Sequence, residues 1–280
     1  MPIGRTLTYG AQDFFDRIVR RELPWYLPPR RLHFIGGGCF LEQGRIFATL
    51  FASLGGLRPD EDVLDIGCGI GRMALPLIEF LEPRSHYEGF DVSTPGIEWC
   101  QREITQRHPN FRFRTADLRN QRYNPRGTVS AAEYRFPYDD ESFDFAISTS
   151  VFTHLRPVEI ENYLREANRV LRPGGRLFGT WYLLGGQRPR ASGAGGNEAA
   201  WFPVEVGSCR AVSQRVPEFA VALEEHLVLD RLHKAGFGDV AVEYGDWLGA
   251  GGPTWQDVVV ATKAPSAATA GVNRGRGPDC

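Results

Sequence analysis

The stretch VLDIGCGIGRMAL at residues 63–75 decides the fold. An apolar run ends in Asp65, and Gly67, Gly69 and Gly71 follow at alternate positions. An apolar pattern with helical spacing comes next. This order predicts a buried strand, a sharp turn and a helix. Because glycine has no side chain, the turn lets a ligand lie against the backbone.

The alternation of strands and helices continues beyond this stretch. Five apolar runs predict strands, at residues 62–66, 86–91, 111–115, 143–149 and 175–183. Three helical patterns lie between them, at residues 70–81, 95–107 and 157–171. A helix near 223–236 and strands near 239–247 and 256–263 would close the sheet. The pattern predicts an α/β fold with a Rossmann-like, doubly wound sheet of seven strands, mostly parallel with one C-terminal antiparallel strand.

The remaining segments suggest one domain over residues 1–263. Helical patterns at 13–22 and 41–54 predict an N-terminal helical cap, and the glycine-rich stretch 185–200 predicts a flexible loop or lid edge. The expected parts are a cap at 1–56, a core at 57–183, a lid or insert at 184–222, closing elements at 223–263 and a disordered tail at 264–280.

Composition excludes several classes of protein. The chain has 280 residues and a net charge of −2, which gives no general attraction to nucleic acid or anionic membranes. It has no apolar run long enough for a membrane span. The five cysteines are scattered, without CxxC pairs or metal-ligand spacing. We expect a cytoplasmic, reduced protein that binds no metal, nucleic acid or membrane.

Two nucleotide-binding alternatives fit the glycine turn poorly. A dinucleotide site spaces its glycines G-x-G-x-x-G, whereas this chain has GCGIG with Arg72 where the last glycine would fall. Asp65 would also repel a pyrophosphate but suits a cationic ammonium group. No lysine follows as in a P-loop.

Two further acids follow the next two predicted strands. Asp91 ends the second strand, where an acid can accept hydrogen bonds from both ribose hydroxyls. Asp117 follows the third strand, where a carboxylate can accept from an adenine amino group. Together with Asp65, these acids favour a nucleoside ligand that carries an ammonium group.

The ordered series of motifs resembles the class I S-adenosylmethionine (SAM)-dependent methyltransferases over roughly residues 40–183. The motifs that carry the resemblance are VLDIGCGIGRMA, GFDVS, ADL, FDFAISTSVFTHL and VLRPGGRLFGT. The resemblance implies SAM as cofactor and S-adenosylhomocysteine (SAH) as product. It implies binding roles for Asp65, Gly67, Cys68, Gly69, Asp91, Val92, Asp117, Leu118, Ser148, Thr149 and Ser150.

The resemblance also implies which part of SAM each residue meets. Asp65 would meet the amino-acid part, Asp91 the ribose, and Asp117 and Leu118 the adenine. The upstream stretch HFIGGG at 33–38 could reach the methionine carboxylate with backbone N–H groups.

Two histidines are candidate general bases. His154 follows the fourth strand and should face the methyl group, and His33 lies on an N-terminal loop that could cover the cofactor. The alternative for His154 is a structural histidine that packs on SAM or caps a turn. For His33 it is a hydrogen bond that anchors the loop.

Three aromatic residues are candidate substrate contacts. Trp181 and Tyr182 end the fifth strand, and one of them should point into the pocket because neighbours on a strand face opposite ways. Trp201 could add lid surface. Each could instead be an ordinary core or cover residue.

The expected acceptor is a hydroxyl group of a small molecule such as a sugar or natural product. The turn STSV replaces the Asn/Asp-Pro-Pro-aromatic stretch of enzymes that methylate adenine or cytosine amines. Two alternatives stay open: an N-methyltransferase that acts on a small amine or a protein, and a protein that binds SAM or SAH without methyl transfer or with another SAM-using activity.

Overall fold

The computed structural model describes residues 27–29, 32, 39–121, 123–186, 197–249 and 251–265. The chain divides into two compact units. The first comprises Met1–Ala131 and Ile147–Val151, and the second comprises Ala132–Ala146 and Phe152–Cys280. The helix predicted at 13–22, His33, most of the glycine-rich loop and most of the tail lie outside the described residues.

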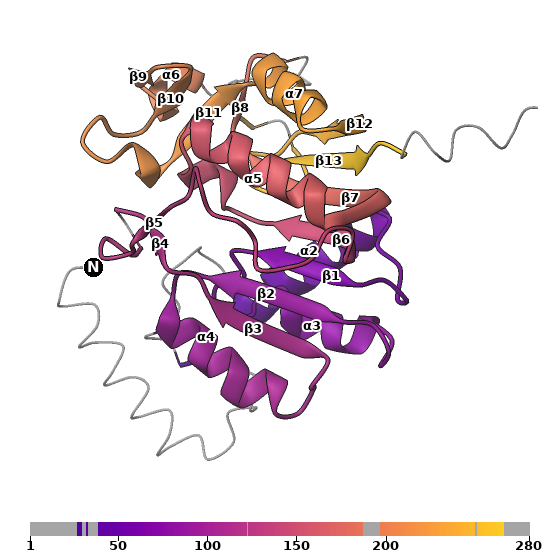
Figure 1. Cartoon of the computed structure of the whole chain (residues 1–280). Coiled ribbons are helices and arrows are strands. Elements are labelled where there is room, and N and C mark those ends of the chain that lie inside the picture. Colours follow the sequence, from indigo (N-terminus) through magenta and orange to yellow (C-terminus); the bar gives the residue numbers. More distant parts are fainter. Residues whose placement is uncertain are drawn as a thin grey trace, which may run out of the picture. The chain divides into compact units, whose positions relative to one another are not determined.

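The principal sheet has seven strands in the order β12-β13-β7-β6-β1-β2-β3 (Figure 1). Its strands are β1 Val63–Ile66, β2 Tyr87–Asp91, β3 Phe111–Thr115, β6 Phe143–Ser148, β7 Leu171–Trp181, β12 Phe237–Glu243 and β13 Asp257–Lys263. β2 pairs in parallel with β1 and β3, whereas β13 is antiparallel to both β7 and β12. The predicted mostly parallel, Rossmann-like sheet with one antiparallel C-terminal strand is confirmed.

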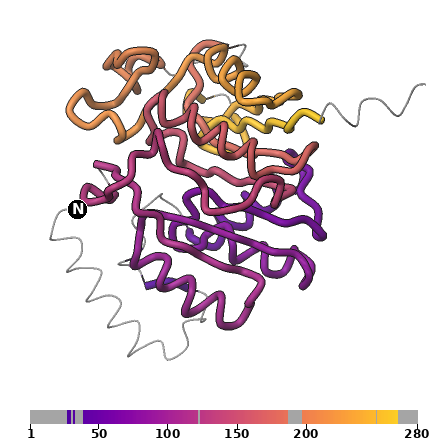
Figure 2. Tube along the Cα trace, viewed as in Figure 1, coloured from indigo at the N-terminus to yellow at the C-terminus, as the bar shows by residue number. Residues whose placement is uncertain are grey.

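The first unit is built around β1, whose four residues are all buried. Its helices are α2 Phe40–Ser53, α3 Ala74–Phe80 and α4 Thr94–Cys100. α4 begins at Ser93, whose hydroxyl accepts from the backbone N–H of Gly96 at 3.3 Å, and it continues into a π-helical turn, Gln101–Thr105. α4 packs on β2 and β3, and α2 packs on α3. The path from α2 to β3 is the indigo-to-magenta part of the tube in Figure 2.

The second unit places α5 Pro157–Val170 against β7, and α7 Glu225–Lys234 against β12. α5 begins where the backbone N–H of Arg156 donates to the Glu159 carboxylate at 2.7 Å. The strand after α5 begins at Leu171 rather than at the predicted residue 175, so the RPGG stretch lies within β7.

The segment predicted as a lid or insert contains a second, four-stranded sheet. Its order is β8-β11-β10-β9, with strands Leu183–Leu184, Val221–Glu224, Cys209–Ala211 and Val204–Val206. Short helices, α6 Glu198–Trp201 and η4 Pro217–Phe219, lie between these strands along the chain. The sequence did not reveal this sheet, because strands of two to four residues are too short to show an alternating pattern. In the first unit, two-residue strands β4 Leu118–Arg119 and β5 Val129–Ser130 also pair.

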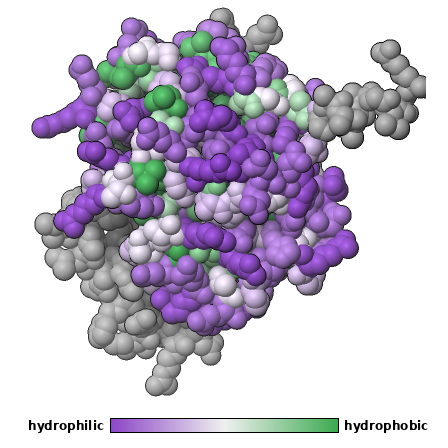
Figure 3. Space-filling model, in the orientation of Figure 1, coloured by the Kyte–Doolittle hydropathy of each residue, from purple (hydrophilic) through white to green (hydrophobic). Residues whose placement is uncertain are grey.

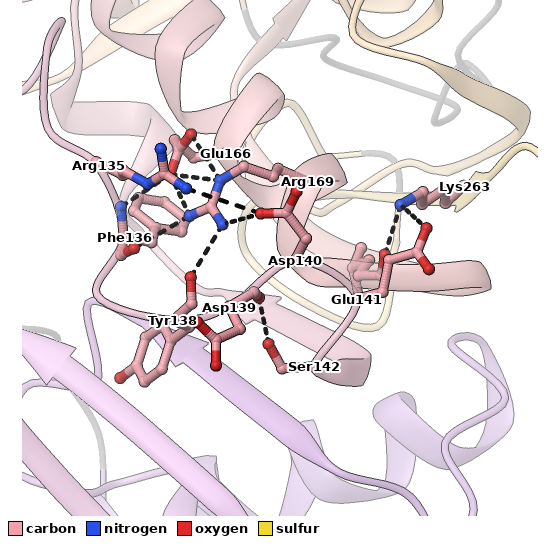
Figure 4. Close-up of polar contacts among 11 residues, drawn as sticks. Arg135, Phe136, Tyr138, Asp139, Asp140, Glu141, Ser142, Glu166, Arg169 and Lys263 are labelled. Atoms are coloured by element: carbon pink, nitrogen blue, oxygen red, sulfur yellow. Dashed lines mark hydrogen bonds and ion pairs between the residues drawn. The ribbon is translucent and has the colours of Figure 1, made fainter.

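A network of ion pairs and hydrogen bonds, which we call the Arg169 cluster, joins the loop at residues 136–140 of the second unit to α5 (Figure 4). It comprises Phe136, Tyr138, Asp140, Glu166 and Arg169. Arg169 binds Glu166 and Asp140, each at 2.7 Å, and donates to the carbonyls of Phe136 at 3.0 Å and Tyr138 at 2.9 Å. The Glu166 carboxylate also accepts from the backbone N–H of Phe136 at 2.9 Å.

The surface is mainly polar in the face drawn in Figure 3, where hydrophobic residues form small, separate spots. Among the helices of the described residues, none is both long and apolar enough to cross a membrane.

Candidate cofactor and active site

The glycine turn follows β1 and lies within the first unit. Gly67, Gly69 and Gly71 all have positive φ, at 77°, 58° and 71°. A Cβ on Gly67 would lie 2.4 Å from the Val151 side chain, whereas a Cβ on Gly69 would meet no described residue within 4 Å. Gly67 is therefore required by packing, and Gly69 leaves room for a ligand close to the backbone.

Asp65 lies fully buried in β1, beneath the glycine turn. Its Oδ2 accepts a short hydrogen bond from the hydroxyl of Tyr87, while Oδ1 has no partner among the described residues. Burial raises the pKa of Asp65 to about 7, the Tyr87 hydrogen bond opposes that rise, and the nearby Asp91 adds to it. A buried acceptor without a donor is costly, so this oxygen suits a donor that a ligand supplies.

Asp91 ends β2 and is 8% exposed. Its carboxylate accepts from the backbone N–H of Gly69 at 2.9 Å and from that of Ser93 at 2.7 Å. Burial raises the pKa of Asp91, and these backbone donors oppose the rise. Because a carboxylate has about four acceptor sites, Asp91 can hold the glycine turn and still accept from ribose hydroxyls.

The turn after β6 supplies further polar groups to the first unit. Ser148 is fully buried, and its hydroxyl has no partner among the described residues. Ser150 has φ of 57°, a left-handed conformation that is strained for a residue with a side chain, and Thr149 is half-buried beside it. Such strained residues concentrate at ligand-binding turns.

The expected adenine side lies at β4. Leu118 is 4% exposed, Asp117 is exposed, and Val92 is half-buried after Asp91. The Asp117 carboxylate accepts from the backbone N–H of Thr128 at 3.3 Å and from its hydroxyl. Asp117 thus fixes the loop that contains Thr128.

Cys68 is buried, and its thiol has the surroundings of a packing residue and not of a nucleophile. Burial raises the pKa of its thiol well above the usual value, so the thiol stays protonated. A Cβ on Gly89 would lie 2.9 Å from the sulfur, which shows how closely the turn approaches β2.

His154 ends a short 3-10 helix, Phe152–His154, in the second unit and is half-buried. Its Nδ1 lies 3.1 Å from the carbonyl oxygen of Glu218. Because a carbonyl only accepts, this contact requires the hydrogen on Nδ1, and the neutral ring then carries its lone pair on Nε2. The other candidate base, His33, lies outside the described residues.

The three candidate aromatic residues differ in burial. Trp181 is 1% exposed and stacks on Phe152 with ring centres 4.1 Å apart. Tyr182 is half-buried and packs on Phe202 and Trp247. Trp201 is 48% exposed.

Sequence reasoning missed Tyr87 and Glu218. Tyr87 lies four residues before Asp91 in the same strand, so a period of two places both on one face of the sheet. That spacing could have identified Tyr87. Nothing local identifies Glu218, which meets His154 from 64 residues away.

The residues of the first unit fit SAM. Asp65 Oδ1 and Ser148 Oγ are among the buried polar atoms that have no hydrogen-bond partner within the described residues, and both suit the ammonium group of an amino acid. Asp91 suits ribose, and Gly69 leaves room at the turn. Within the described part of the chain, no group of three or more His, Cys, Asp and Glu residues could hold a metal ion.

Comparisons with known proteins agree with this fit. Residues 63–175 match the family described as "Methyltransferase domain". An uncharacterized 37.1 kDa protein in transposon TN4556 of Streptomyces fradiae is 32% identical over 176 residues, which cover 63% of this chain and 46% of that protein. The nocamycin O-methyltransferase of Saccharothrix syringae is 29% identical over 203 residues, covering 65% of this chain and 61% of the relative.

The chain thus spans about half the length of the curated relatives it matches. Among solved structures, the PH0226 protein from Pyrococcus horikoshii OT3 has a TM-score of 0.53 at 17% identity, covering 88% of this chain and 98% of that one. At that identity the likeness shows the fold alone. Over residues 63–175, this chain is thus similar to the methyltransferase domain family.

Proposed function

We propose that this protein transfers the methyl group of SAM to a hydroxyl group of a small molecule, such as a sugar or natural product. The family match supports SAM as cofactor, and SAH is then the product. The similarity to a nocamycin O-methyltransferase supports a small hydroxylated acceptor. The observation that carries the choice of a hydroxyl is the hydrogen bond between His154 and Glu218.

In this proposal the first unit binds SAM, which supplies an activated methyl group. Asp65 and Ser148 hold its amino-acid part, and Asp91 holds its ribose. Gly67, Cys68 and Gly69 line the turn beside it. Val92, Asp117 and Leu118 flank the adenine, and Thr149 and Ser150 close the methionine side. Asp65 Oδ1 and Ser148 Oγ, which are buried and lack a hydrogen-bond partner among the described residues, support this assignment.

His154 acts as the general base. A hydroxyl acceptor must lose its proton during methyl transfer, whereas an amine mainly needs its lone pair. The Glu218 carbonyl orients the imidazole through Nδ1, and Nε2 is then the atom that receives the proton. His33 remains a second candidate for this role.

The aromatic residues differ in their proposed contributions. Tyr182 is the better candidate for direct acceptor contact, because Trp181 is packed in the core. Trp201 offers an exposed aromatic face to an acceptor.

Methyl-labelled SAM, incubated with a panel of hydroxylated natural products and sugars and a matched panel of amines, tests the proposal. We expect labelled products from the hydroxyl panel, detected by mass spectrometry. His154→Ala should lower that rate by about 100-fold or more at pH 7 and slow an amine far less. A full rate of His154→Ala on a hydroxyl would overturn the role of the histidine.

The same assay separates the alternatives. Products from amines alone would identify an N-methyltransferase. Calorimetric binding of SAH, with no product from either panel, would indicate a SAM-binding protein without methyl transfer or with another SAM-using activity.

A further inference from the structure

The carboxylate of Asp65 is held from one side only. The Tyr87 hydroxyl donates to Oδ2, and no other hydrogen bond reaches the carboxylate from the described residues. Parallel pairing of β1 with β2 sets Val63 opposite Tyr87 and Asp65 opposite Gly89. Asp65 and Tyr87 therefore lie on the same face of adjacent strands.

Tyr87 has no freedom to turn away. It is fully buried, and its ring lies 5.0 Å from the ring of Phe111 and 5.8 Å from that of Phe113. Both phenylalanines are on β3, the next strand of the sheet. The ring is therefore locked by packing, and its hydroxyl fixes the orientation of the carboxylate it binds.

Among the described residues, none of the groups that face Asp65 is a cation. They are Tyr87 and Asp91 from β2, Cys68 from the glycine turn and Cys100 from α4. Burial raises the pKa of both thiols and of the phenol well above their usual values, so these groups stay neutral. The described residues therefore offer Asp65 no positive partner, and the ammonium group of a ligand can supply one.

We propose that Tyr87 is a positioning residue for the cofactor: its hydroxyl turns Asp65 so that Oδ1 of the ionised carboxylate faces the ammonium group of SAM. The inference rests on the proposed contact between Asp65 and the amino-acid part of SAM. The ammonium keeps its own proton, and where the Asp65 carboxyl is protonated before binding, its proton passes to the solvent.

A pH dependence follows from this arrangement. Burial raises the pKa of Asp65 to about 7, so part of the empty protein has a neutral carboxyl near neutrality. Only the ionised form pairs with an ammonium group. The affinity should therefore be roughly eightfold weaker at pH 6 than at pH 7.5, in proportion to the ionised fraction.

Calorimetric titration of SAH between pH 6 and 7.5, in buffers of different ionisation enthalpy, measures affinity and proton release together. The wild type should release close to one proton at pH 6 and only a fraction of one at pH 7.5. Tyr87→Phe should bind about tenfold more weakly or worse at pH 7.5. Its pH profile should also move upward, because the Tyr87 hydrogen bond opposes the rise in the pKa of Asp65.

Two control variants make the result decisive. Phe178→Leu removes fully buried packing in the second unit and leaves Tyr87 and its ring contacts unchanged, so it should lower the unfolding temperature without moving the pH profile. Asp65→Asn removes the titrating group, so it should weaken binding and flatten the profile.

The outcomes separate the positioning role of Tyr87 from the proposed contact between Asp65 and SAM. Wild-type affinity and profile in Tyr87→Phe, with a flat profile in Asp65→Asn, would overturn the role of Tyr87 alone. Wild-type behaviour in Asp65→Asn would overturn the proposed contact between Asp65 and SAM.

Discussion

Asp65 in the first unit and Glu166 in the second are both buried acids, and their surroundings differ sharply. Glu166 receives the Arg169 guanidinium and the backbone N–H of Phe136 within the Arg169 cluster (Figure 4). Within the described part of the chain, Asp65 accepts from a single hydroxyl and keeps one oxygen without a partner. A fully paired acid stabilises its own fold, whereas an under-paired one costs stability until a ligand completes it. We propose that this difference separates Glu166, which holds the structure, from Asp65, which binds a ligand.

The strongest test of this distinction removes the cation of the paired site. Arg169→Ala should lower the free energy of unfolding by about 3–5 kcal/mol, because Glu166 would remain buried without its counter-charge. Chemical denaturation measures the loss. Titration of SAH into the folded variant should give the wild-type affinity. A large loss of SAH affinity in this variant would break the distinction.

The glycine turn shows the same contrast between structure and binding. Gly67→Ala should cost about 2–4 kcal/mol of unfolding free energy, because it adds backbone strain at positive φ to a collision with Val151. The methyl group of Gly69→Ala meets no neighbour among the residues that the structure describes, so this variant should cost only the strain, about 1–2 kcal/mol. Its methyl group enters the space left for the cofactor, so SAH affinity should fall more than stability. Equal losses of stability in the two variants would contradict the assignment of Gly69 to the ligand.

A substitution at Asp65 should have the opposite effect from one in the Arg169 cluster: it should weaken SAH binding and leave the free energy of unfolding undiminished. Asp65→Asn should weaken SAH binding by about 2 kcal/mol, since a charged hydrogen bond to the ammonium is lost. Its free energy of unfolding at pH 8 should be equal to or higher than that of the wild type. Calorimetry and chemical denaturation measure the two quantities. A loss of stability without a loss of binding would place Asp65 with the structural acids.

The pH dependence of stability gives a separate check on Asp65. Burial raises its folded-state pKa from 3.8 to about 7. The stability from the neutral carboxyl is therefore fully present below 3.8 and is lost as pH rises through about 7. Asp65→Asn stays neutral, so its stability relative to the wild type should rise between pH 5 and pH 8. A difference in unfolding free energy between the variant and the wild type that stays constant over that range would contradict the raised pKa of Asp65.

The sequence allowed prediction of the features that depend on local pattern. Asp65, the three glycines of the turn and Asp91 follow from apolar runs that end in turns, and the parallel sheet follows from their alternation with helices. Features that depend on distant contacts were out of reach. Asp65 meets Tyr87 from 22 residues away, and His154 meets Glu218 from 64 residues away. The sheet β8-β11-β10-β9 has strands too short to leave a periodic signal.

The smallest expected effect lies at the exposed edge of the Arg169 cluster. Asp140 binds Arg169 at 2.7 Å, as Glu166 does, but its side chain is 67% exposed against 10% for Glu166. Water screens an exposed pair, so Asp140→Asn should leave the denaturation midpoint at pH 7 unchanged, whereas Glu166→Gln should lower it. The Arg169 hydrogen bond lowers the pKa of Asp140, so the residue is already ionised at that pH and the comparison tests the charge itself. Equal losses in the two variants would mean that contact distance, rather than burial, decides the strength of these pairs. The burial of Asp65 would then also be a poor guide to its role in ligand binding.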